Sequence, residues 1–172
     1  MTTQAAILAD AFDRVRDAVH PAAGGLSTEE LAFRPDGDGN SIAWLVWHLT
    51  RIQDDHVAGV AGREQVWVEE GWVDRFALPL DPTDTGYGHS PEDVAAVVVE
   101  AKLLLDYFEA VHQRTQAFVA GLSADELDRV VDPNWDPPVT CGTRLVSVIA
   151  DDLQHVGQAA YVRGIVQRRN PD

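Results

Sequence analysis

The sequence lacks several features that would each indicate a class of protein. It contains one cysteine, Cys141, so an intrachain disulfide is excluded, and this fits a reducing cytoplasm, the compartment that we expect. Basic residues are scarce, because 13 Lys and Arg stand against 28 Asp and Glu, which gives a formal net charge of −15. Such a surface repels phosphate backbones and anionic lipids, so we expect neither a nucleic acid nor a membrane as a partner.

Long apolar runs and strand-like alternation are also absent. The apolar runs are a few residues long, far short of the ~20 residues needed to span a bilayer. The first residues contain no basic stretch followed by an apolar core, so we expect no signal peptide. What remains is an ordinary folded composition, with 45% hydrophobic and 24% charged residues in a chain of 172.

Apolar residues recur at helical spacing in four long segments. They predict helices over residues 3–20, 40–62, 90–120 and 143–167, with Pro21 and the Gly24–Gly25 pair ending the first. Residues 63–89, rich in Gly, Pro and Trp, indicate a packed crossover with one or two short helices. The proline-rich stretch 132–138 is expected to be a loop. We therefore predict a single all-α domain over residues 1–172, a four-helix bundle with a long crossover between helices 2 and 3.

The last predicted helix carries acids beside the residues that it should bury. On a helical projection Asp152 falls within the apolar arc, His155 falls near its edge, and Asp151 lies only about 40° from His155. Residues four apart are neighbours on a helix, so Asp151 and His155 can direct a carboxylate and an imidazole at one point. A catalytic zinc ion usually takes three protein ligands. The natural third donor is His48, beside the apolar face of the second predicted helix.

The same residues also allow a structural interpretation. A single histidine on an apolar face is more often a hydrogen-bonded core residue, and Asp152 could pair with Arg144 or Arg163 instead of lying near a metal. His56 lies eight residues beyond His48, roughly 12 Å along the helix axis, so it does not share a small site with His48. Periodicity alone leaves a metal site and a structural polar pair both open.

Two stretches, GNSIAWLVWHLTRIQDDHV (39–57) and ADDLQHVGQAAYVRG (150–164), resemble the DinB/YfiT-like superfamily. The closer resemblance is to its branch of mycothiol-dependent S-transferases and maleylpyruvate isomerases. Members are four-helix bundles, often dimeric, so a homodimer is also expected, and many bind one divalent metal ion, commonly zinc or nickel. The resemblance implies His48, Asp151 and His155 as the metal ligands. Asp151 stands where the family more often has His or Glu, and Asp152 is the alternative ligand.

The resemblance also implies an activity. It points to a metal-dependent transferase that activates a low-molecular-weight, mycothiol-like thiol for attack on a small electrophile. A bound cation stabilises a thiolate over a thiol, so the chain needs no nucleophilic cysteine, and Cys141 is expected to be structural. Asp55 or His56 could accept the thiol proton, and Trp44 or Trp47 could form an apolar wall. The alternatives are a metal-dependent hydrolase of a small molecule and a non-enzymatic, stress-associated binding or dimerisation module.

Overall fold

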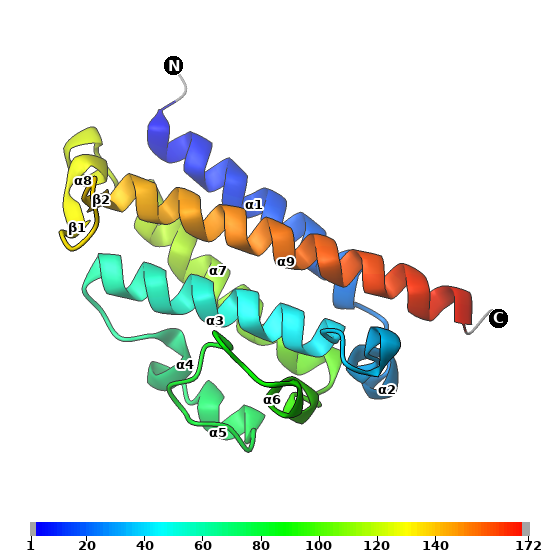
Figure 1. Ribbon diagram of the computed structural model, residues 1–172. Coiled ribbons are helices and arrows are strands. Elements are labelled where there is room, and N and C mark those ends of the chain that lie inside the picture. The colour runs from blue at the N-terminus through cyan, green and yellow to red at the C-terminus, as the bar shows by residue number, and fades with distance from the viewer. Residues whose placement is uncertain (1–2, 170–172) are drawn as a thin grey trace.

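Four long helices form the body of the protein in the computed structural model, which describes residues 3–169 (Figure 1). They are α1 (Gln4–Ala23), α3 (Ile42–Ala61), α7 (Ala101–Ala120) and α9 (Cys141–Arg169). Helix α9 packs against α1 and α3, and α7 packs against the same two helices from the other side. The predicted all-α four-helix bundle is therefore confirmed. No helix within residues 3–169 has the length and the apolar character needed to cross a membrane.

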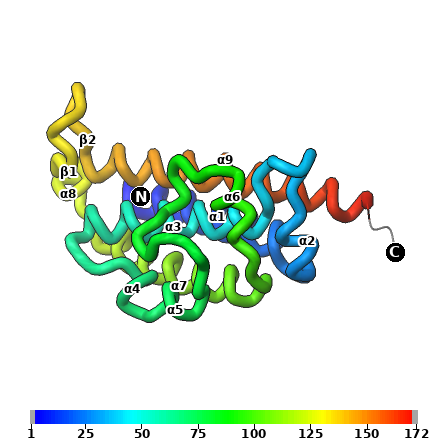
Figure 2. Tube along the Cα trace, turned by 60° about the horizontal axis from the view of Figure 1, so that its bottom comes forward, coloured from blue at the N-terminus to red at the C-terminus, as the bar shows by residue number. Residues whose placement is uncertain are grey.

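Short elements connect the long helices. The segments α2 (Thr28–Ala32) and η1 (Pro35–Gly37) join α1 to α3, and the crossover from α3 to α7 contains α4 (Val66–Glu69), α5 (Trp72–Phe76) and α6 (Pro91–Ala96). Before α9 come α8 (Ala124–Asp128) and an antiparallel pair of strands, β1 (Val130–Asp132) and β2 (Val139–Thr140). Figure 2 shows the crossover, in green, lying across α3.

Three local predictions were wrong. Helix α1 continues past Pro21 to Ala23 and ends at the predicted Gly24–Gly25 pair, with Gly24 as its C-cap; because Pro21 lies only two residues before this end, the hydrogen bond that proline cannot donate weakens only the last turn. The helix predicted over 90–120 is interrupted between Ala96 and Ala101, where the run of three β-branched residues 97–99 is a poor helix former. Strands β1 and β2, which flank the proline-rich loop, were not expected.

Helix α3 is the central helix, and its bounds follow from the sequence as predicted. The Ser41 hydroxyl accepts a hydrogen bond from the Trp44 amide at the first turn, and Gly62 ends the helix in the left-handed conformation, with φ of 65°. Residues 42–51 are all buried, because α7, α9 and the crossover together enclose this part of α3. A helix buried on every side must satisfy each polar side chain internally.

The core of the bundle is divided by a layer of polar residues. On α3, Gln53 lies between Leu49, which belongs to one apolar cluster, and Val57, which belongs to another. Thr115 on α7 and Asp152 on α9 occupy the corresponding positions. Four residues before and four residues after each of them lies an apolar residue, one from each cluster. All three polar side chains are buried, and the Gln53 amide donates to the Thr115 hydroxyl at 2.8 Å.

Candidate metal centre

His48 is held on α3 by contacts that settle which ring nitrogen is free. Its side chain is buried, stacks on Trp44 with 4.7 Å between ring centroids, and places Nδ1 2.5 Å from the carbonyl oxygen of Thr85. A carbonyl can only accept, so Nδ1 carries the proton and Nε2 keeps its lone pair. Burial lowers the pKa of His48, which keeps the imidazole neutral, as a metal ligand must be.

The crossover loop that supplies the Thr85 carbonyl is held by hydrogen bonds to residues before and after Thr85. The Arg51 Nε donates to the Asp84 carbonyl at 3.0 Å, and the Trp44 indole donates to His89 Nδ1 at 3.2 Å. Gly86, with φ of +95°, lies directly against the His48 ring, so a Cβ at this position would stand 2.6 Å from Nδ1. Only glycine allows the loop to approach this closely.

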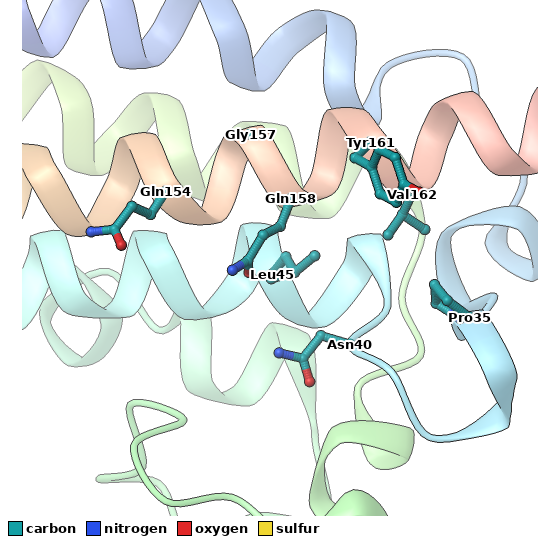
Figure 3. A pocket seen from close by; sticks show the side chains of 8 residues that line it. All are labelled: Pro35, Asn40, Leu45, Gln154, Gly157, Gln158, Tyr161 and Val162. Atoms are coloured by element: carbon teal, nitrogen blue, oxygen red, sulfur yellow. The ribbon is translucent and has the colours of Figure 1, made fainter.

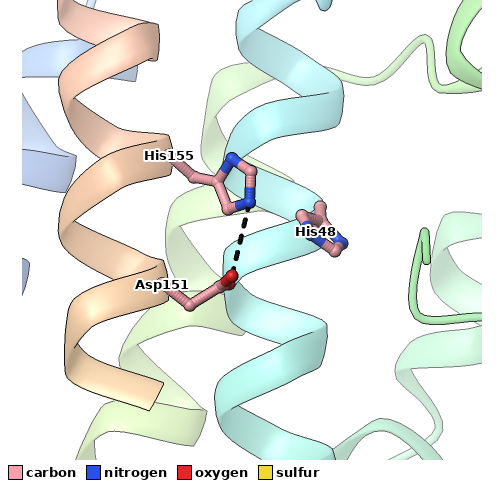
Figure 4. A group of neighbouring side chains, drawn as sticks. All are labelled: His48, Asp151 and His155. Carbon is pink, nitrogen blue, oxygen red and sulfur yellow. Dashed lines mark ion pairs between the residues drawn. The ribbon is translucent and has the colours of Figure 1, made fainter. Parts of the chain in front are cut away.

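Asp151 and His155 lie one turn apart on α9, facing His48 (Figure 4). The His155 Nδ1 donates to the side-chain oxygen of Gln158 at 3.1 Å, and its Nε2 stands 3.6 Å from Asp151 Oδ1. The contact between Asp151 and His155 raises the pKa of the imidazole and lowers that of the carboxyl. The rings of His48 and His155 meet edge to face, with 4.7 Å between their centroids.

The three predicted residues therefore converge. One ligand atom from each of His48, Asp151 and His155 lies within 4.8 Å of the other two. Asp151 Oδ2 is buried and has no hydrogen-bond partner among the described residues. Burial of such an oxygen costs free energy, which a bound cation would offset. Two imidazole nitrogens and one carboxylate are a donor set that zinc and other divalent ions accept. The residues present thus fit a metal ion with one or more open positions.

Asp152, the alternative ligand, does not belong to this group. Its side chain is fully buried in the core, and neither oxygen has a hydrogen-bond partner among residues 3–169. The arginines considered as its partners are engaged elsewhere, Arg144 with Asp132 at 3.4 Å and Arg163 with the carbonyl of Gly24 at 2.8 Å. Desolvation, together with the charge of Asp151, raises the pKa of Asp152 well above the ordinary value, which favours the neutral form of its carboxyl.

Two pockets lie near the three converging side chains, and each is lined by residues of α3 and α9 among others. The larger, about 510 Å³, includes Gln158 and lies toward the C-terminal end of α9 (Figure 3). The smaller, about 290 Å³, is lined by Asp55, His56 and Arg144 among others. Burial lowers the pKa of His56, which leaves its imidazole free to accept a proton. A small molecule therefore has room on either side of the candidate metal centre.

The remaining predicted residues take structural or supporting places. Cys141 is buried at the start of α9, and Trp47 is buried against Trp67 and His89, so neither lies in the group of ligands. Three residues that touch the ligands were not predicted: Thr85, Gly86 and Gln158. For Gln158 the available signal was its spacing, three residues after His155 on a helix. For Thr85 and Gly86 the sequence held no signal that they would contact His48.

Comparisons with known proteins agree with this architecture. The family model described as the DinB superfamily matches residues 11–159. A crystal structure of a conserved protein from Enterococcus faecalis is similar over 96% of this chain and 98% of that chain, with a TM-score of 0.89 and 33% sequence identity. No curated protein matches the sequence significantly.

Proposed function

The chain belongs to the DinB superfamily, and from that premise we propose that it is a metal-dependent transferase that activates a low-molecular-weight, mycothiol-like thiol for attack on a small electrophile. The observation that carries the proposal is the convergence of His48, Asp151 and His155, with Nδ1 of each histidine hydrogen-bonded so that Nε2 is the nitrogen left for a cation. Zinc or nickel suits this donor set. When bound, a divalent ion would lower the pKa of an entering thiol and stabilise its thiolate.

The chain's own residues supply the rest of the chemistry. The sulfur of the thiol attacks an electrophilic carbon, a C–S bond forms, and the bond to the leaving group breaks with its electron pair. The thiol proton passes to a base, and Asp55 or His56, which both line the smaller pocket, is the proposed acceptor; burial lowers the pKa of His56 and so favours its neutral imidazole. Cys141 takes no part because it is buried at the N-terminus of α9.

Metal content and thiol binding test the proposal directly. Untagged protein should contain one equivalent of a divalent metal, and His48→Ala or Asp151→Ala should lose it. Protein loaded with Co²⁺ should change its visible absorption when a thiol is added, because the spectrum reports the ligands. The loaded wild type should also form a thioether from chlorodinitrobenzene and a thiol, releasing chloride.

The other candidate functions give different results in the same experiments. Stoichiometric metal without any spectral response to thiols, combined with turnover of ester or amide substrates, would identify a hydrolase. Protein that contains no metal, and whose His155→Ala variant changes only in stability, would be a binding module with a structural polar pair. Either result overturns the transferase proposal.

A further inference from the structure

Gln158 touches both the candidate metal centre and the larger pocket. Its side-chain oxygen accepts the Nδ1–H of His155 at 3.1 Å, and its side chain also lines the pocket of about 510 Å³ (Figure 3). It is exposed on α9, as is Gln154, one turn earlier in the same pocket wall. The Gln154 amide instead donates to the Ala150 carbonyl, and no hydrogen bond joins it to His155.

The two histidines are secured in different ways. The Nδ1 of His48 is bound by the backbone carbonyl of Thr85, in a loop that is fixed on both sides. The Nδ1 of His155 has a single partner among the described residues, the exposed side chain of Gln158. Hydrogen bonds of this kind orient a ligating imidazole and keep its proton on the far nitrogen. The Nδ1 side of His155 is therefore held by one exposed amide, while its Nε2 faces Asp151 at 3.6 Å.

The pocket itself is uncharged. Its polar lining groups are the amides of Asn40, Gln154 and Gln158 and the hydroxyl of Tyr161, and the other lining residues are glycine or apolar. A carboxylate-bearing ligand would find no cation in this lining, whereas amides and hydroxyls would find donors and acceptors. The lining therefore suits an uncharged, hydrogen-bonding part of a small molecule.

We propose that Gln158 is a positioning residue that holds His155 for the metal from the wall of the pocket, where it also meets an uncharged, amide- or hydroxyl-bearing part of the thiol. The second half of this inference rests on the proposed function, and the first half does not. A ligand bound in the pocket contacts the same Gln158 amide that accepts the hydrogen bond from His155, so it either competes for this hydrogen bond or strengthens it. Ligand binding and metal binding are then coupled through one side chain.

Metal affinity tests the positioning role without any turnover. Competition of zinc with a chromophoric chelator should show about tenfold weaker binding or worse in Gln158→Leu, the range seen when such outer contacts are lost. Gln158→Glu keeps an acceptor oxygen and should restore most of the affinity. Gln154→Leu is the matched control, since it removes an exposed amide from the same wall, and it should bind zinc like the wild type. Equal affinities for Gln158→Leu and the wild type, or equal losses in both leucine variants, would overturn the positioning role.

A pair of thiols that differ only in charge tests the pocket. N-acetylcysteine amide is uncharged, and N-acetylcysteine carries a carboxylate. In Co²⁺-loaded protein the amide should bind about threefold to tenfold more tightly, the effect of roughly one hydrogen bond, and Gln154→Leu should weaken its binding while leaving metal affinity intact. Equal binding of the two thiols refutes the assigned pocket. If neither thiol alters the spectrum, the transferase proposal fails, and the positioning role is still decided by the zinc affinities.

Discussion

Asp152 provides a quantitative test of how the core of this bundle is built. Its carboxyl is fully buried between two apolar clusters, has no hydrogen-bond partner within the described chain, and has a pKa raised well above the ordinary value by desolvation and by Asp151. The folded protein therefore keeps Asp152 protonated at pH values where the unfolded chain ionises it. We predict that Asp152→Asn, a neutral isostere, stabilises the metal-free protein at neutral pH.

The sign and size of the effect follow from proton linkage. A group whose pKa is higher in the folded state contributes its full stability below the unfolded pKa, and this contribution is lost as the pH rises toward the folded pKa. For Asp152 the wild type loses about 1.4 kcal/mol for each pH unit above the unfolded value of about 3.9, as long as the folded carboxyl stays protonated. Asparagine has no such cost. The two proteins should be equally stable near pH 4 and should diverge above it, at about this slope until the folded carboxyl ionises.

Urea unfolding of chelator-treated protein, followed by circular dichroism from about pH 4 to about pH 7, measures this difference. Asp151→Asn is the matched control, because its carboxyl is the next residue along and its pKa is lowered by His155. The ionised form of Asp151 favours the folded state, so the control should gain no stability at neutral pH, and it should lose metal binding. A free-energy difference between Asp152→Asn and the wild type that does not change with pH would refute the protonated, unpartnered state of Asp152.

Three further predictions concern the candidate metal centre. Gly86→Ala should weaken zinc binding at least about tenfold, measured by chelator competition, because its Cβ would stand 2.6 Å from His48 Nδ1 and displace the ring. Zinc affinity should fall as the pH decreases through the raised pKa of His155, because the imidazolium cannot bind a cation; titrations at several pH values check this, and a flat profile would exclude His155 as a ligand. Arg51→Lys should lower both the thermal midpoint and the zinc affinity, since the fully buried guanidinium holds the crossover carbonyl next to Thr85; unchanged affinity would show that the loop does not depend on this contact.

The helices were predictable because each has one dominant periodic face. Helix α3 begins after Ser41 and ends at Gly62, as capping chemistry indicates. The break between α6 and α7 was not predicted, because the residues on both sides continue the same apolar stripe and only the β-branched run 97–99 disfavours a helix. The low helix propensity of valine amounts to a few tenths of a kcal/mol per residue. This is too small to predict a break where the apolar pattern of a helix continues.

Asp151 and Asp152 were alternative metal ligands, and the helical projection placed both correctly without deciding between them. The projection placed Asp152 in the apolar arc and Asp151 beside His155, and the structure has the same arrangement. The sequence did not reveal that an unpaired acid would be tolerated in the core. That tolerance requires the carboxyl to stay neutral, and the other members of the polar layer, Gln53 and Thr115, come from other helices and bond to each other rather than to Asp152.

The contacts that orient the histidines explain why the rest of the site escapes sequence analysis. The acceptor for His48 is a backbone carbonyl of the crossover, and a carbonyl leaves no trace in residue identity, so Thr85 looks like any other loop residue. Gly86 is required by a close approach between segments 38 residues apart in number, since Gly86 meets His48. The spacing of Asp151 and His155 on α9 is set locally, whereas the orientation of the third candidate ligand, His48, depends on how the crossover packs over α3. Metal affinity in this protein should therefore depend on the packing of the crossover as much as on the ligands themselves.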